Sequence, residues 1–168
     1  MSSRTIEIVQ NGAMRITAKA DYALRASAVL AASEPGVPIK GEAIATAQHI
    51  PLHFTENILR ELRRAGIVRT QRGADGGYLL AVAANTVSVA DVIRAVEGPL
   101  AAIQGVRPEQ LHYDGAAETL GDVWIALRAS IRVVLETVTL ADLASGVLPK
   151  AVQALVDDPD SWVARVVR

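Results

Sequence analysis

The chain has 168 residues, of which 51% are hydrophobic and 21% charged, so a packed core is expected rather than general disorder. It has no cysteine, which excludes disulfides, thiolate nucleophiles and cysteine-ligated zinc or iron–sulfur sites. No apolar run approaches the ~18 residues of a membrane span, and residues 1–13 lack the apolar stretch of a signal peptide. We therefore expect a soluble, cytoplasmic protein with no membrane contact.

The formal net charge of −1 conceals an asymmetry between the two halves of the chain. Residues 14–84 carry nine Lys/Arg and six Asp/Glu, whereas residues 85–168 carry seven and eleven. A basic front half favours contact with a polyanion, and an acidic rear half favours a different task.

Three helices are predicted in the front half, after a flexible tail over residues 1–13. Strong helix formers at helical spacing predict the first over about 17–32. A short helix over 41–48 leads through a tight turn to a third over 52–65, which Gly66 ends.

Two short strands follow, over residues 67–72 and 78–82. The three glycines of 73–77 lie between them, which is typical of a β-hairpin with a flexible tip. This order of elements is typical of a winged helix-turn-helix domain: a helix, a short helix, a turn, a third helix and a hairpin. We assign the domain to residues 14–84.

The rear half is predicted to be helical around one irregular stretch. Ser88 and Asp91 form the pattern of a capping box that opens a helix to about Glu97. Residues 85–146 are interpreted as a linker or sensor loop and a dimerisation helix, and residues 147–168 as a C-terminal helical tail. The predicted helical segments are 119–138, 139–146, 149–156 and 161–168. The expected fold is mainly α with a small β-hairpin wing.

The exposed face of helix 52–65 carries side chains of the types that can read DNA bases. Asn can bind adenine through two hydrogen bonds, Glu can accept from cytosine, and Arg can pair with guanine or phosphate. His53, Glu56, Asn57 and Arg60 gather in the N-terminal half, where a recognition helix meets base edges. Arg72 beside the wing glycines suits a narrow minor groove. The basic cluster comprises Arg60, Arg63, Arg64, Arg69 and Arg72.

Two other interpretations use the same residues. Three helices and a hairpin can form any small α+β core, and a winged helix can lose DNA binding and serve a partner protein instead. The exposed face of helix 52–65 and Arg72 beside the wing glycines favour DNA binding over a generic core, and the retained arginine cluster favours double-stranded DNA over a protein partner.

Four segments resemble the Rrf-two family of winged-helix regulators, which includes IscR, NsrR and CymR. They are MRITAKADYALRA (14–26), IPLHFTENILRELRRAGIVRTQRGADGGYLL (50–80), VADVIRAVEGP (89–99) and TLADL (139–143). The resemblance implies a homodimeric transcription regulator, usually a repressor. It places Glu56 and Asn57 at base-reading positions, Arg72 in the minor groove, and Pro51, His53 and Phe54 near the DNA. Thr55 departs from the large apolar residue usual in the family.

The sensor region departs further from the family. Better-known members bind an iron–sulfur cluster through cysteines, but residues 100–124 contain none, and Asp21 alone cannot hold iron. The chain therefore resembles the cluster-free members, with no cofactor. Its effector is left open between a small molecule, a partner protein and none at all.

Histidines give neither a metal site nor a catalytic one. His49 and His53 are four residues apart, but Pro51 between them argues against one continuous helical face that could bind a metal. His112 lies near Glu109 and Asp114 in the sequence, but no convincing nucleophile accompanies it. The wing has no lysine that would make it a phosphate-binding loop. We expect no metal ligand, no catalytic residue and no enzyme activity.

The long helix has an apolar seam at 4-3-4-3-4 spacing, typical of helices that pair. An internal core stripe is the alternative, but a winged domain already has its own core. Roughly 19 residues span about 28 Å, so two crossing helices could hold two recognition helices one DNA turn, about 34 Å, apart. The predicted dimer interface, and with it a palindromic operator, rests on Leu120, Trp124, Leu127, Ile131, Val134 and Val138.

Overall fold

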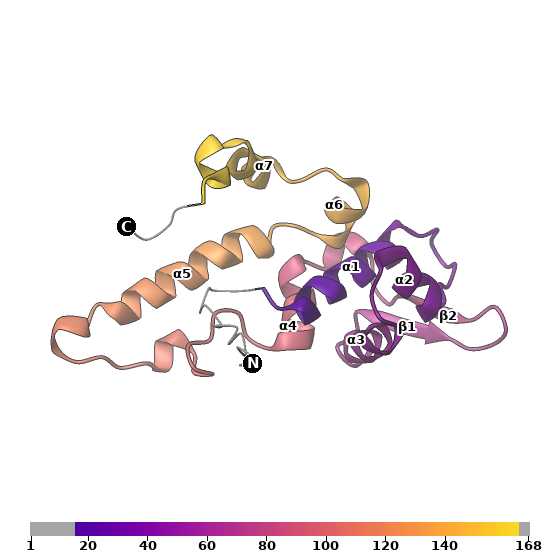
Figure 1. The fold of residues 1–168 in the computed structure, drawn as a ribbon, viewed down its shortest axis with the longest axis horizontal. Coiled ribbons are helices and arrows are strands. Elements are labelled where there is room, and N and C mark those ends of the chain that lie inside the picture. Colours follow the sequence, from indigo (N-terminus) through magenta and orange to yellow (C-terminus); the bar gives the residue numbers. More distant parts are fainter. Residues whose placement is uncertain (1–15, 165–168) are drawn as a thin grey trace, which may run out of the picture.

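The computed structural model describes residues 16–164, and the expected tail over residues 1–13 lies outside them. Within that range the fold is mainly α with one two-stranded hairpin, as predicted (Figure 1). In chain order the elements are α1 (Ala18–Ala32), α2 (Gly41–Gln48), α3 (Leu52–Arg64), β1 (Val68–Gln71), β2 (Gly77–Leu80), α4 (Val89–Glu97), α5 (Leu120–Leu135), α6 (Leu140–Ser145) and α7 (Lys150–Asp157).

The hairpin is anchored to the start of α2 by a third extended segment. β1 and β2 pair antiparallel, with Val68 opposite Leu80, and Tyr78 also exchanges two backbone hydrogen bonds with Ile39 at 2.8 and 2.9 Å. A Cβ on Gly77 would lie 2.4 Å from the Ile39 carbonyl oxygen. Only glycine therefore permits this close approach, which fixes the base of the wing.

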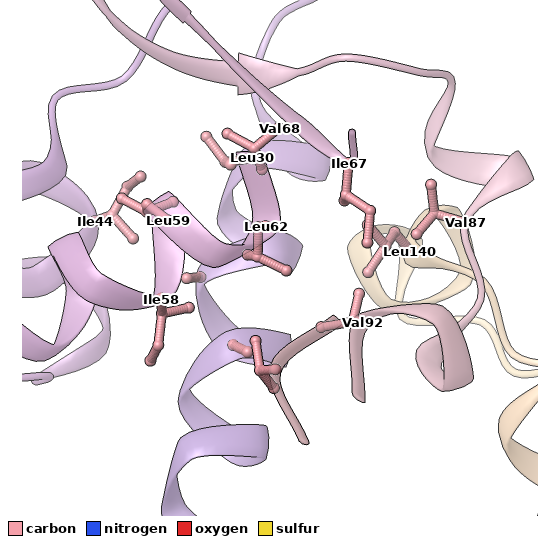
Figure 2. Packing of buried hydrophobic residues seen from close by; sticks show 13 residues of the cluster. Leu30, Ile44, Ile58, Leu59, Leu62, Ile67, Val68, Val87, Val92 and Leu140 are labelled. Carbon is pink, nitrogen blue, oxygen red and sulfur yellow. The ribbon is translucent and has the colours of Figure 1, made fainter. Parts of the chain in front are cut away.

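The main core joins the winged domain to segments far along the chain. Figure 2 shows Ile58 and Leu62 of α3 in the same cluster as Val92 of α4 and Leu140 of α6. Leu140 is fully buried, and its backbone N–H donates to the Val87 carbonyl at 2.9 Å. The core beneath α3 therefore draws on α4 and α6, beyond residue 84.

The long helix ends three residues earlier than expected. α5 stops at Leu135, so its 16 residues span about 24 Å rather than 28 Å. Val138 lies beyond the helix because its carbonyl accepts from the Val89 N–H at 2.8 Å, which ties the chain to α4. Thr139 then caps α6.

The last expected helix, over 161–168, is wrong in its described part. α7 ends at Asp157, and a 3-10 turn follows over Pro159–Trp162. Pro159 cannot continue the α-helical hydrogen bonding, and the Asp158 side chain caps the turn by accepting from the Asp160 N–H at 2.9 Å.

α5 projects away from the domain formed by α1–α4, and the hairpin tip points toward the opposite end of the molecule (Figure 1). The segment from residue 99 to residue 118 runs outward from α4 alongside α5, and α5 then returns toward the core (Figure 1). None of the helices in the described chain is long and apolar enough to cross a membrane.

Candidate nucleic-acid interface

α3 has one buried and one exposed face. Thr55, Ile58, Leu59 and Leu62 face the core with at most 2% of their surface exposed. Thr55 packs there without a polar conflict, because its hydroxyl approaches the Pro51 carbonyl oxygen at 3.4 Å. The unusual residue at this position is thus accommodated in the core.

The exposed surface contains every side chain that the sequence assigned to DNA. All ten of these residues are exposed: Pro51, His53, Phe54, Glu56, Asn57, Arg60, Arg63, Arg64, Arg69 and Arg72. Phe54 is 48% exposed, and Leu52 beside it is 39% exposed. This end of α3 is therefore available to a partner surface.

The N-terminal half of α3 is packed against α1 by aromatic contacts that the sequence analysis missed. The Tyr22 ring lies 6.4 Å from the Phe54 ring, edge to face, and Arg25 lies over Tyr22 at 5.4 Å. Arg25 also donates to the side chain and backbone carbonyl of Gln48, which ties α1 to the end of α2. No periodicity reveals this contact, because it joins three separate helices.

Two hydrogen-bonded pairs shape the electrostatics of α3. Arg60 donates to the Asn57 side-chain oxygen at 2.8 Å, one helical turn away. Glu61 forms an ion pair with Lys19 of α1 at 2.8 Å. Glu56 is consequently the exposed carboxylate of α3 that no ion pair among the described residues neutralises.

The arginines of the basic cluster do not all lie together. Arg60 and Arg64 line a cavity of about 400 Å³ between α1 and α3. Arg72 lies just beyond β1, beside the wing glycines. Arg69 instead borders a different cavity, formed with the end of α1 and residues 33–36. The structure brings Arg60 and Arg64 together and sets Arg69 apart from them.

The predicted seam of α5 is only half covered by the chain itself. Leu120, Trp124, Leu127, Ile131 and Val134 are partly buried, and Trp124 donates to the Tyr113 hydroxyl at 3.0 Å. Val138 is 5% exposed in a core cluster with Ala20 of α1 and Val152 of α7. The far side of α5 stays open, with Val123 54% and Val133 65% exposed.

The candidate metal residues do not come together. Among residues 16–164, no three His, Asp or Glu side chains form a group that could hold a metal ion. Asp21 pairs with Arg25 at 3.2 Å, and Glu109 pairs with Arg128. A hydrogen bond from its own backbone, followed by that of Arg128, lowers the pKa of Glu109.

Comparisons with known proteins give one consistent family. A protein of Mycobacterium tuberculosis named as an HTH-type transcriptional regulator, Rv1287, is 48% identical over 145 residues, which cover 86% of this chain and 90% of that protein. The HTH-type transcriptional regulator CymR of Bacillus subtilis is 32% identical over 79% of this chain and 91% of its own. These names describe regulators rather than enzymes.

Solved structures agree with these relatives. The CymR structure from B. subtilis matches with a TM-score of 0.68 at 32% identity, covering 80% of this chain and 98% of that one. The IscR structure from T. potens matches with a TM-score of 0.63 at 29% identity, covering 91% and 94%. Both likenesses support the winged-helix fold.

The family model described as Rrf2, iron-dependent transcriptional regulator, matches residues 16–146. The side chains present do not fit iron: the chain offers no thiolate, and the cavity between α4 and α5 is lined by arginines, which repel a cation. The match nevertheless spans most of the chain and agrees with the relatives and the fold, so this chain belongs to the Rrf2 (Rrf-two) family of transcriptional regulators.

Proposed function

We propose that this chain is a homodimeric repressor that binds double-stranded DNA, with α3 in the major groove and the wing in the minor groove. The observation that carries the proposal is the uncovered face of α3, on which Glu56, Asn57 and Arg60 lie exposed above a fully buried apolar side. A helix with this division can rest on its own domain and still present polar side chains to base edges.

The dimensions of α3 suit that role. Its 13 residues make a rod of about 20 Å, and the major groove, about 12 Å wide, admits a helix. Arg63 and Arg64 lie in the last turn, where a cation also interacts favourably with the helix dipole. In this arrangement base reading falls to the first half of α3, and phosphate contact to the second half.

Dimerisation through α5 is supported by what the chain leaves uncovered. No residue of this helix is fully buried, although its composition is largely apolar. The open side carries Val123, Ala126, Ser130 and Val133, with no charge among them. Pairing with a second copy would cover both this side and the half-covered seam, and would give the twofold symmetry that a palindromic operator requires.

Repression is supported by the family resemblance, in which most members repress. A dimer that occupies both grooves covers the DNA that a polymerase needs. In a reporter strain, deletion of the gene is expected to raise transcription from promoters that contain the operator; lowered transcription would indicate an activator.

The salt dependence of DNA binding separates this proposal from a protein-interaction winged helix. A dimer with about 6–10 phosphate contacts should lose roughly 10³–10⁵ in affinity between 50 and 200 mM salt, because binding releases counterions. Fluorescence anisotropy with a duplex measures it. Arg64→Gln should flatten the slope, whereas Lys150→Gln on the distant α7 should not. Binding that ignores salt would sink the proposal.

A further inference from the structure

Four arginines from three separate segments line one small cavity between α4 and α5. Arg94 comes from α4, Arg107 from the segment after it, and Arg128 and Arg132 from α5. The cavity measures about 250 Å³, and Glu109 is the carboxylate among its lining residues. None of these four arginines is among the residues proposed to contact DNA.

The local charge remains positive after the ion pairs are counted. Arg94 pairs with Asp91 at 3.4 Å and with Glu136, Arg132 pairs with Glu136 at 2.9 Å, and Arg128 pairs with Glu109. Four guanidinium groups thus face three carboxylates. Hydrogen bonds from Arg94 and then Arg132 also lower the pKa of Glu136, as a positive field requires.

Many donors in the cluster are left for a ligand. Each guanidinium offers five N–H groups, and the ion pairs above use only a few of them. The Arg107 guanidinium makes no hydrogen bond or ion pair with any residue from 16 to 164, whereas the Arg107 backbone carbonyl accepts from the Gln110 N–H at 2.9 Å. Arg128 has 23% of its side chain exposed, so water screens it less than a fully exposed arginine.

We propose that this cavity binds a small oxyanion carrying two or more negative charges, held by Arg107 and Arg128 and by Arg94 across from α4. Guanidinium groups match carboxylate and phosphate oxygens in planar, two-bond geometry. A doubly charged ligand can compete with Glu109 and Glu136 for the arginines, whereas a single charge gains little over them. The cavity volume of about 250 Å³ restricts the ligand to a small molecule that carries a few phosphate or carboxylate groups.

The position of the cavity gives the ligand a way to act. α4 packs against α1 and belongs to the core beneath α3, while α5 projects away from that core. An anion that bridges Arg94 to Arg128 would replace the ion pair between Arg94 and Glu136. Loss of that ion pair would change the packing of α4 against α5. This effect on operator affinity rests on the proposed function, but binding of the anion does not.

Isothermal titration calorimetry on the full chain, with pyrophosphate and citrate as separate probes at constant ionic strength, tests the site. We expect saturable binding of at least one probe at one site per chain. Pyrophosphate alone would identify a phosphate-bearing ligand, and citrate alone a carboxylate. Arg107→Gln and Arg128→Gln should each weaken binding about tenfold or more, whereas Lys150→Gln removes one charge on α7 and should change nothing.

Arg107→Gln is not expected to change the fold, because the Arg107 side chain forms no ion pair with any residue from 16 to 164. Circular dichroism checks the fold of each variant. If neither probe binds, or if both arginine variants bind as the wild type does, the inference is wrong. If the probe binds but the protein ignores duplex DNA, the proposed function fails and the anion site stands.

Discussion

Asn57 and Arg60 are joined before any DNA is present, since the arginine donates to the asparagine oxygen at 2.8 Å. This bond leaves the Asn57 amide donors free and holds Arg60 along the helix surface. The exposed positions of α3 were predictable, because a helix with apolar residues at 55, 58, 59 and 62 must turn its other side outward. The separation of Arg69 from Arg60 and Arg64 could not be predicted, because it depends on which face of β1 packs against the end of α1.

Base-reading and positioning residues should give different substitution profiles. Glu56→Ala and Asn57→Ala are each expected to cost about 1–3 kcal/mol at one operator position and little elsewhere. Arg64→Ala should weaken all duplexes about equally, because a phosphate contact carries no sequence information. Competition assays on single-base operator variants measure both. Unchanged base preferences in Asn57→Ala would show that its role is misassigned.

Two reciprocal capping boxes fix the start of α4 and of α6. Ser88 and Asp91 form the first, as predicted, and Thr139 and Asp142 form the second. Hydrogen bonds from the backbone and then the hydroxyl of Thr139 lower the pKa of Asp142. Both boxes can be read from adjacent residues. The early end of α5 could not be predicted from neighbouring residues, because it follows from a backbone hydrogen bond between the Val89 N–H and the Val138 carbonyl, which are far apart in the sequence.

The second box offers a matched test of element stability. Thr139 accepts from the Asp142 N–H at 3.2 Å, whereas Thr119 stands at the same position of α5 without a capping hydrogen bond. Thr139→Ala should lower the free energy of unfolding by about 1 kcal/mol. Thr119→Ala should change it much less. Urea unfolding measures both, and equal losses would mean that the Thr139 cap contributes nothing special.

A winged core and a projecting helix make up most of the described chain. The sequence predicted both parts and their order. It did not predict that α6 returns to the core through Leu140, nor that four arginines meet between α4 and α5. Those features depend on contacts between residues widely separated along the chain, which periodicity within one helix cannot register.

Substitutions on the open side of α5 should separate assembly from folding. Val133→Asp is expected to weaken dimerisation by orders of magnitude, because a desolvated, unpaired charge costs several kcal/mol. The fold should survive, since Val133 is already 65% exposed in the single chain. Val147→Asp is the control, with 66% exposure before α7. Sedimentation reports assembly and circular dichroism the fold.

A Val133→Asp variant that stays dimeric would leave Ile131, on the half-covered seam, as the next position to change. If Ile131→Asp also stays dimeric and folded, α5 does not join the subunits.

In the proposed dimer, two copies of α3 read one palindrome. Duplexes selected by the protein from a random pool, then footprinted with hydroxyl radicals, test it most directly. A dimer that reads one palindrome should protect two half-sites related by twofold symmetry, with centres about 34 Å, or 10–10.5 base pairs, apart or at a multiple of that spacing. Protection of a single asymmetric site, or no enrichment of any sequence, would contradict it.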